Sequence, residues 1–246
     1  MSNHSKPRIE IIEQPAPRGY RFHYDPHLFG LESIPGINST EANPTFPTIR
    51  IVGLETSAEL TVSCVTARSP YKVHPHRLVP MHGQMGIGVI RTIIQPSRNY
   101  FQLARIAILM TNKSDFNAEF AIRRNMRIDP FNQGYNHDRA RDPVGVDVNA
   151  LRLCFEARLL DITNTLYTET LTPVISWPIY NKFTNTNYRI LDFEPDAVPI
   201  TGGAELRIWG CQNLTANVGV RFSDIKNCGS WEEIVYPLPR REGESV

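Results

Sequence analysis

The stretch Arg18-Gly-Tyr-Arg-Phe-His-Tyr24 alternates aromatic and cationic side chains. In an extended chain its three aromatic residues fall on one side, whereas Arg21 and His23 fall on the other. This pattern predicts a β-strand that packs its aromatic side into a sandwich core and presents cations on the opposite side. Because the planar guanidinium group donates two parallel hydrogen bonds, such a surface suits phosphates and guanine edges. The same alternation is also typical of an ordinary half-buried strand with solvated charges.

The rest of the chain indicates an all-β fold. Short strand-like runs are separated by clusters of Pro, Gly, Asn and Ser. The 19 prolines and 15 glycines would interrupt many helices but suit a β-sandwich. The predicted strands cover residues 9–12, 20–24, 48–52, 59–65, 87–94, 106–110, 151–159, 205–209 and 218–222.

One helix is predicted, over residues 115–125. Ser114 or Asp115 can cap its N-terminus. The side chains expected to face the core are Phe116, Phe120 and Ala121. The arginines near its C-terminal end are Arg123, Arg124 and Arg127. The helix macrodipole favours cations at that end, and contact with phosphate is the alternative role for them.

Composition limits the classes of protein that the chain can represent. Its 246 residues suffice for one large or two modest domains, and 41% hydrophobic with 21% charged residues indicates a soluble globular protein. The net charge is only +1, so any nucleic-acid-binding surface must be local. No apolar segment resembles a signal peptide or reaches the roughly 18 residues of a membrane helix, and we therefore expect a cytosolic or nuclear protein.

The four cysteines show no C-x-x-C spacing, which argues against a zinc module. Cys64 and Cys154 lie inside predicted strands, so we expect them to be buried thiols that act as small hydrophobic residues.

Several separate blocks of the chain occur in the order known from one family. These blocks are Pro7–Pro15, Arg18–Tyr24, Ser33–Gly36, Pro70–Val79, Asp129–Phe131, Leu151–Phe155 and Pro173–Tyr180. Over about residues 7 to 230 the chain resembles the Rel homology region of Rel/NF-kappaB transcription factors. The resemblance implies an immunoglobulin-like β-sandwich DNA-binding domain over residues 7–181, a linker over 182–188 and a partial immunoglobulin-like dimerisation domain over 189–246. An immunoglobulin-type sandwich needs roughly 100 residues, so we expect the second domain to be truncated and its dimerisation to be weakened.

The resemblance also identifies the residues that contact DNA. The family's loop pattern is R-F-R-Y-x-C-E-G-R-S-A-G followed by S-I-P-G, and the corresponding residues 21–36 align with it without a gap. The residues expected to bind DNA are Arg18, Arg21, His23, Tyr24, His27, Lys113 and Lys182. Among them, only Arg21 and Tyr24 match the family's loop residues.

The other loop positions depart from the family pattern. His23 and Phe29 replace arginines, Pro26 replaces the cysteine, and His27 replaces the glutamate that accepts from cytosine. Each bidentate base contact discriminates between bases by roughly 1–3 kcal/mol. Histidines are largely neutral near pH 7 and attract phosphate weakly. We therefore expect weaker binding with a relaxed sequence preference.

The pair His74 and His76 allows a metal site in principle, because residues two apart share one face of a strand. His82 is the only other histidine nearby. The motif recurs in the Rel family as a loop element, which favours a structural or DNA-facing role. No Ser-His-Asp or paired-carboxylate motif is present, so we expect no enzyme, no cofactor and no metal.

The resemblance implies a sequence-specific transcription factor that binds double-stranded DNA at κB-type sites and regulates RNA polymerase II transcription. It also implies ankyrin-repeat inhibitor proteins and Rel-family dimer partners, and residence in both cytoplasm and nucleus. The alternative hypothesis is a non-DNA-binding, Rel-like interaction module or decoy that binds inhibitors or Rel partners.

Overall fold

The computed structural model divides the chain into two units, Met1–Lys182 and Phe183–Val246. It describes residues 6–24, 32–81, 86–137, 146–182, 190–195, 197–199, 201–210, 220–223 and 232–235.

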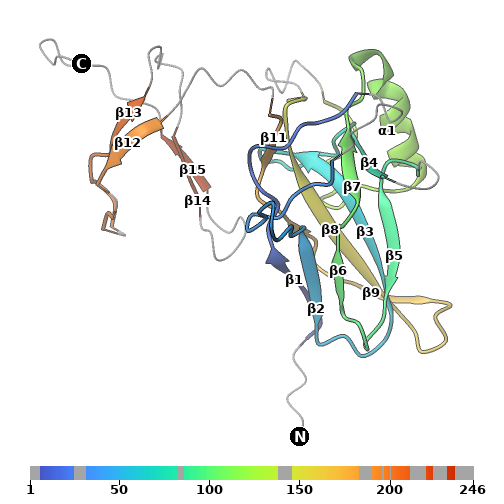
Figure 1. Ribbon diagram of the computed structural model, residues 1–246. Helices are drawn as coiled ribbons and strands as arrows, with labels where there is room; N and C mark the ends of the chain where they lie inside the picture. Colours follow the sequence, from blue (N-terminus) through green and yellow to red (C-terminus); the bar gives the residue numbers. More distant parts are fainter. Residues whose placement is uncertain are drawn as a thin grey trace, which may run out of the picture. The chain divides into compact units, whose positions relative to one another are not determined.

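The described residues of the first unit form eleven strands and one α-helix (Figure 1). The strands are β1 (Arg8–Glu13), β2 (Thr48–Val52), β3 (Ala58–Thr66), β4 (Arg77–Pro80), β5 (Ile90–Ile94), β6 (Tyr100–Gln102), β7 (Ile106–Leu109), β8 (Ala150–Leu160), β9 (Tyr167–Thr170), β10 (Val174–Ile175) and β11 (Ile179–Tyr180). One sheet has the order β1-β2-β6, and a six-stranded sheet has the order β10-β8-β3-β5, with β9 and β11 also pairing with β8. Strands β4 and β7 form a separate antiparallel pair. The expected all-β class is confirmed.

The main hydrophobic core takes side chains from both larger sheets. In β2, Ile49 and Ile51 are buried whereas Arg50 between them is exposed, as expected for a strand with one face in the core. Strand β3 differs, because both of its faces are covered. Its second face contributes Val65 to a smaller cluster that also contains Ile175.

Most predicted strands are present, with shifts of one to three residues at their ends. The range 48–52 is confirmed as β2, and 151–159 lies within β8. The prediction for 20–24 is wrong, since this segment forms only an isolated bridge at His23. The strands of the first unit that are missing from the prediction are β4, β6, β9, β10 and β11, which have two to four residues each and are too short to show a period.

Both core cysteines are as predicted. Cys64 and Cys154 are buried and free. Burial raises the pKa of the Cys64 thiol to about 12, and it also raises the pKa of Cys154. Both therefore stay protonated and serve as packing residues.

The predicted helix is confirmed as α1 (Phe116–Asn125), which follows a short 3₁₀ turn, η1 (Lys113–Asp115). Asp115 occupies the N-cap position, but its side chain makes no capping hydrogen bond and instead accepts one from Ser114 Oγ at 3.1 Å. The predicted core face is partly wrong, because Ala121 is exposed and Phe116 only half-buried. The buried residues of the helix are Glu119, Phe120 and Arg123.

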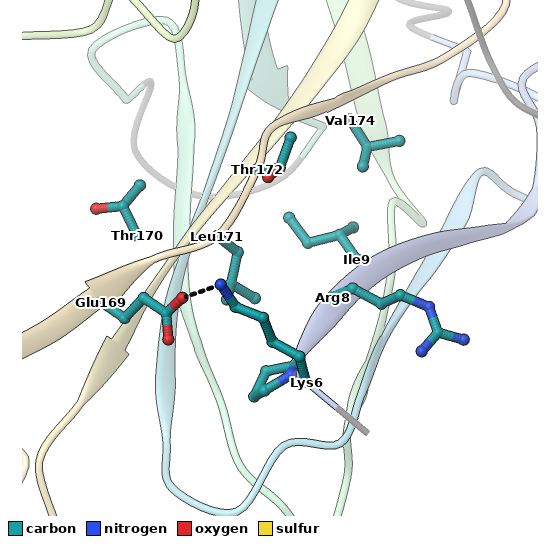
Figure 2. Close-up of a pocket in the computed structure, with 9 residues that line it drawn as sticks. Lys6, Arg8, Ile9, Glu169, Thr170, Leu171, Thr172 and Val174 are labelled. Carbon is teal, nitrogen blue, oxygen red and sulfur yellow. Dashed lines mark ion pairs between the residues drawn. The ribbon is translucent and has the colours of Figure 1, made fainter. Parts of the chain in front are cut away.

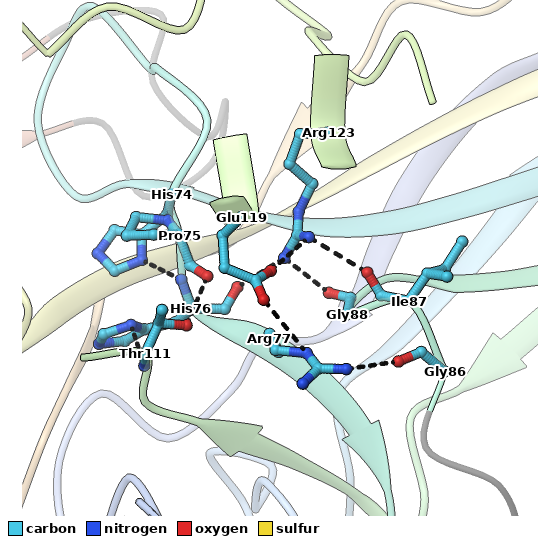
Figure 3. Close-up of polar contacts among 10 residues, drawn as sticks. All are labelled: His74, Pro75, His76, Arg77, Gly86, Ile87, Gly88, Thr111, Glu119 and Arg123. Atoms are coloured by element: carbon cyan, nitrogen blue, oxygen red, sulfur yellow. Dashed lines mark hydrogen bonds and ion pairs between the residues drawn. The ribbon is translucent and has the colours of Figure 1, made fainter. Parts of the chain in front are cut away.

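Arg123 does not have the phosphate-contacting role that the sequence leaves open for the arginines near the end of α1. Its side chain is 1% exposed and lies beneath the helix (Figure 3). Nη1 donates to Glu119 Oε2 at 2.9 Å and to the Ile87 carbonyl at 3.2 Å. Nη2 donates to the carbonyls of His76 at 3.2 Å and Gly88 at 3.3 Å. The arginine thus binds the helix to two loops of the sandwich and has no exposed surface to offer a phosphate.

The second unit contains two antiparallel strand pairs among its described residues. Strand β12 (Ile190–Glu194) pairs with β13 (Arg207–Gly210), and β14 (Val220–Ser223) pairs with β15 (Glu232–Val235). The ranges predicted for β13 and β14 are therefore about two residues early. Within the described part of both units, no helix is long and apolar enough to cross a membrane.

Candidate nucleic-acid interface

The segment 17–24 runs beside the end of β7. The backbone N–H of His23 donates to the Ile108 carbonyl at 3.0 Å, and the N–H of Met110 donates to the His23 carbonyl at 2.6 Å. His23 bridges Leu109 in parallel orientation, so this contact does not extend into an antiparallel ladder. The bonds fix the segment next to the turn that carries Lys113, three residues beyond Met110.

The other side of the segment is bound by the last residue of β11 and the residues that follow it. The N–H of Tyr180 donates to the Pro17 carbonyl at 2.9 Å, and the N–H of Lys182 donates to the Tyr20 carbonyl at 2.8 Å. Three segments distant in sequence, 17–24, 110–113 and 180–182, therefore converge at one edge of the sandwich. We call this edge the convergent edge.

Two aromatic residues anchor the convergent edge, as the alternation predicts. Tyr20 and Phe22 are both buried in the main core. The Tyr20 hydroxyl accepts from the Ile108 N–H at 3.0 Å and donates to the Glu32 carbonyl at 3.1 Å. Burial raises the pKa of Tyr20, so the hydroxyl remains a donor. Tyr24 departs from the pattern, because it is 63% exposed and does not pack in the core.

His23 is the clearest departure from the predicted strand. Its side chain is buried, at 8% exposure, although the alternation places it on the solvent face with Arg21. The reason is the parallel bridge to β7, which turns the ring inward beside Tyr20. The Glu32 N–H donates to Nε2 at 3.4 Å, so the ring also bonds to the backbone nine residues further along the chain.

The charge of His23 follows from its burial. Desolvation lowers the pKa of His23 below its ordinary value; Glu32 raises it and Arg21 lowers it further, both to a smaller extent. The imidazole is therefore neutral near pH 7. At the position where the family pattern has an arginine, this chain has an uncharged, inward-facing ring.

The convergent edge exposes most of the other predicted DNA contacts. Arg18, Arg21, Lys113 and Lys182 are exposed, as is Tyr24. The Arg18 guanidinium carbon lies 5.7 Å from the centroid of the Tyr180 ring, close enough for a cation–π contact that restrains the side chain. His27 lies outside the described residues.

Asn181 also belongs to the convergent edge, although nothing in the sequence marks it. It is buried at 6% exposure, and its Oδ1 accepts from the Phe22 N–H at 3.1 Å. A lone asparagine after the two-residue strand β11 has no periodic or motif signature. A long-range contact of this kind emerges only when the two segments, 159 positions apart, are seen together.

His74 and His76 have a structural role. His74 Nδ1 accepts from the His76 N–H at 3.1 Å, and its Nε2 contacts the Asp147 carbonyl at 3.0 Å. His76 Nδ1 accepts from the Thr111 N–H at 3.2 Å, and its Nε2 contacts the Val148 carbonyl at 2.8 Å. Each ring must therefore be the neutral tautomer with its proton on Nε2.

All four ring nitrogens of this pair are occupied by backbone groups, which leaves none to coordinate a metal. Among the residues that the structure describes, no group of three or more potential ligands could hold a metal ion. The loop that contains His74 and His76 instead accepts two hydrogen bonds from Thr111, two residues before Lys113. In this way it supports the convergent edge.

A pocket of about 330 Å³ lies elsewhere on the first unit (Figure 2). It is bordered by the start of β1 and by the chain from β9 to β10, and an ion pair of 3.1 Å between Lys6 and Glu169 crosses it. None of the predicted DNA-binding residues lines this pocket. The candidate site is therefore an exposed protein edge, as expected for contact with a macromolecule rather than a small ligand.

The first unit is similar in sequence to a known family of domains. The family model of the Rel homology DNA-binding domain matches residues 9–182. The embryonic polarity protein dorsal of Drosophila melanogaster is 35% identical over 230 residues, which are 92% of this chain and 22% of that protein. The proto-oncogene c-Rel of Meleagris gallopavo is 35% identical over 234 residues, covering 93% of this chain and 41% of that protein.

Among solved structures, the dorsal homologue Gambif1 bound to DNA is 38% identical, with a TM-score of 0.64. The match covers 71% of this chain and 99% of that chain, and it confirms the expected immunoglobulin-like β-sandwich. The chain spans less than half of the length of dorsal and of c-Rel. With a matching family model over most of its length and relatives of this similarity, the chain belongs to the Rel/NF-kappaB family.

Proposed function

We propose that this protein is a Rel-type transcription factor that binds double-stranded DNA through the convergent edge and regulates RNA polymerase II transcription. The observation that carries the proposal is the convergence of three segments that expose Arg18, Arg21, Lys113 and Lys182 beside Tyr24. Cations at one edge neutralise phosphates, and a restrained arginine can donate to a guanine edge. Because the net charge of the whole chain is only +1, the attraction to DNA must come from this local group of cations.

We infer that base discrimination is weaker than in a Rel protein with the full loop pattern. Arg21 is the one loop arginine left among residues 21–29. His23 is buried and neutral, so its ring brings no charge to the DNA. Phosphate contacts position the protein on the duplex whereas base contacts specify the sequence, so this edge supports weak binding with a relaxed sequence preference.

Arg21→Ala should reduce the preference for a κB-type duplex over a scrambled duplex by about 1–3 kcal/mol, because it removes a bidentate base contact. We would measure this preference by fluorescence anisotropy titration with both duplexes at several salt concentrations.

Lys182→Ala, in contrast, should weaken binding to both duplexes alike, since it removes a phosphate contact. In the same titrations, the slope of log affinity against log salt concentration should become shallower by roughly one unit.

The matched control is Arg98→Ala. Arg98 is exposed like Arg21 and Lys182, but it belongs to the turn between β5 and β6. This variant should bind both duplexes like the wild type. Equal wild-type affinities for both duplexes at every salt concentration would disprove sequence-specific binding.

The proposal extends to partners and location. We propose κB-type sites as targets, ankyrin-repeat inhibitor proteins and Rel-family subunits as partners, and distribution between cytoplasm and nucleus. We also propose that residues 7–181 form the DNA-binding domain, that residues 182–188 form the linker and that residues 189–246 belong to the dimerisation domain. Analytical ultracentrifugation of the 246-residue chain, with and without a duplex, tests the dimerisation.

A second function is favoured by one observation, the inward, uncharged His23 at a base-contacting position of the family pattern. On that ground the protein could be an interaction module that binds inhibitors or Rel partners without binding DNA. Co-precipitation with an ankyrin-repeat inhibitor, together with no shift of a labelled κB-type duplex, would support this function over the first.

A further inference from the structure

Segment 20–24 does not belong to a regular β-ladder. Its backbone groups instead bond to residues in separate parts of the chain. Tyr20 accepts from Lys182, and His23 donates to Ile108 and accepts from Met110. The N–H of Phe22 lies between these positions, on a residue with a buried side chain. A buried backbone N–H needs a partner, and Asn181 Oδ1 supplies it at 3.1 Å.

The carboxamide of Asn181 is itself held on its other side. Nδ2 lies 3.3 Å from Asn149 Oδ1 and 3.7 Å from Met110 Sδ, and the backbone N–H of Asn181 donates to the Asn149 carbonyl at 2.9 Å. The Phe22 N–H requires an acceptor, so the oxygen of the amide must face Phe22 and the nitrogen must face Asn149. The buried amide therefore has one defined orientation.

We propose that Asn181 is a positioning residue for DNA recognition: its buried amide fixes the backbone at Phe22 and thereby the directions of Arg21 and Tyr24. Both exposed side chains come from residues adjacent to Phe22. A bidentate contact to a base tolerates only small displacements of the donor, so the peptide on which Arg21 is mounted must be rigid. This inference rests on the proposed DNA binding and adds a residue that would not touch the DNA.

The proposed role of Asn181 also connects DNA recognition to residues 180–182, the last residues of the first unit. Tyr180, Asn181 and Lys182 all bond to segment 17–22, through two backbone groups and one side chain. Residues 180–182 are thus bonded directly to the segment that carries Arg21. Among these contacts, only the one from Asn181 can be removed without altering the backbone.

The test compares Asn181→Leu with Asn181→Asp in the full chain. Leucine has nearly the same size but no acceptor, whereas aspartate keeps an acceptor for the Phe22 N–H. We expect N181L to lower the ratio of κB-type to scrambled affinity by about tenfold, and N181D to keep it within about threefold of the wild type. Native-state hydrogen exchange at the Phe22 amide should accelerate in N181L and stay slow in N181D.

A purely structural role would reduce the folded fraction and weaken both duplexes in proportion, leaving the ratio unchanged. Circular dichroism melts therefore accompany each titration, and Asn181→Ala, which also lacks an acceptor, replaces N181L if the leucine variant does not fold. An unchanged ratio in folded N181L or N181A would overturn the inference. A wild-type protein that does not discriminate between the duplexes would overturn the proposed function itself. The wild-type protein is therefore titrated with both duplexes before any variant is compared.

Discussion

Arg123→Met is expected to destabilise the first unit by about 3–5 kcal/mol, the typical cost of removing one partner from a buried ion pair. The guanidinium group is 1% exposed and donates to Glu119 and to three carbonyl groups. Methionine fills much of the volume but offers no donors. Glu119 would keep only the more distant Arg77, whose Nε lies 3.9 Å from Oε1. Urea denaturation followed by circular dichroism measures the change.

Arg124→Met is the matched control for this prediction. Arg124 is the next residue of the same helix but is exposed, with its guanidinium carbon 5.2 Å from the centroid of the Tyr135 ring. Its loss should cost no more than about 1 kcal/mol. Adding Glu119→Leu to Arg123→Met should recover part of the lost stability, since it removes the unpaired carboxylate. Similar unfolding free energies for the Arg123 and Arg124 variants would contradict the assignment of Arg123 as the buried attachment of α1.

The second large effect is a loss of stability in mild acid. Desolvation is the largest cause that lowers the pKa of His76, to about 4, and it lowers the pKa of His74 as well. In the unfolded chain both rings titrate near 6.5. Between about pH 6.5 and pH 4 the unfolded chain therefore binds more protons than the native protein. The unfolding free energy should fall as the pH falls through this window, by about 3 kcal/mol from His76 alone.

The structural cause of this loss of stability is that Nδ1 of each ring already accepts a hydrogen bond. Protonating His76 on Nδ1 would break its bond from the Thr111 N–H, and protonating His74 on Nδ1 would break its bond from the His76 N–H. Urea denaturation at a series of pH values would measure the loss. His76→Gln, which does not titrate, should be less stable at neutral pH but have a shallower pH dependence. The same slope in wild type and variant would show that His76 is not the titrating group.

The core of the sandwich was predictable because its pattern is local. In β2 the alternation of Ile49 and Ile51 with Arg50 shows which face is buried, and the β-branched residues favour the strand. The burial of Cys64 follows from its place in the middle of the strand-forming run Thr61–Val65 of β3. Helix α1 was also predictable in extent, since its cap residues and helix-forming composition lie within a dozen positions.

The convergent edge was predictable only in part. The family pattern identified Arg21 and Tyr24, and the structure exposes both. His23 could not be placed from the sequence, because its direction depends on a parallel bridge to Leu109, 86 positions away. Asn181 has no local signature at all, and its importance comes from the unmatched N–H of Phe22.

The sequence by itself determined the all-β class, the aromatic anchors Tyr20 and Phe22, and the family to which the chain belongs, because side-chain periodicity and short motifs are properties of neighbouring residues. Only the tertiary structure decided that Arg123 is buried and that His23 faces inward. A charged or polar side chain enters a core only where donors and acceptors from distant segments meet it. Those partners, the carbonyls of residues 76, 87 and 88 for Arg123 and the Glu32 N–H for His23, come together only when the chain is folded.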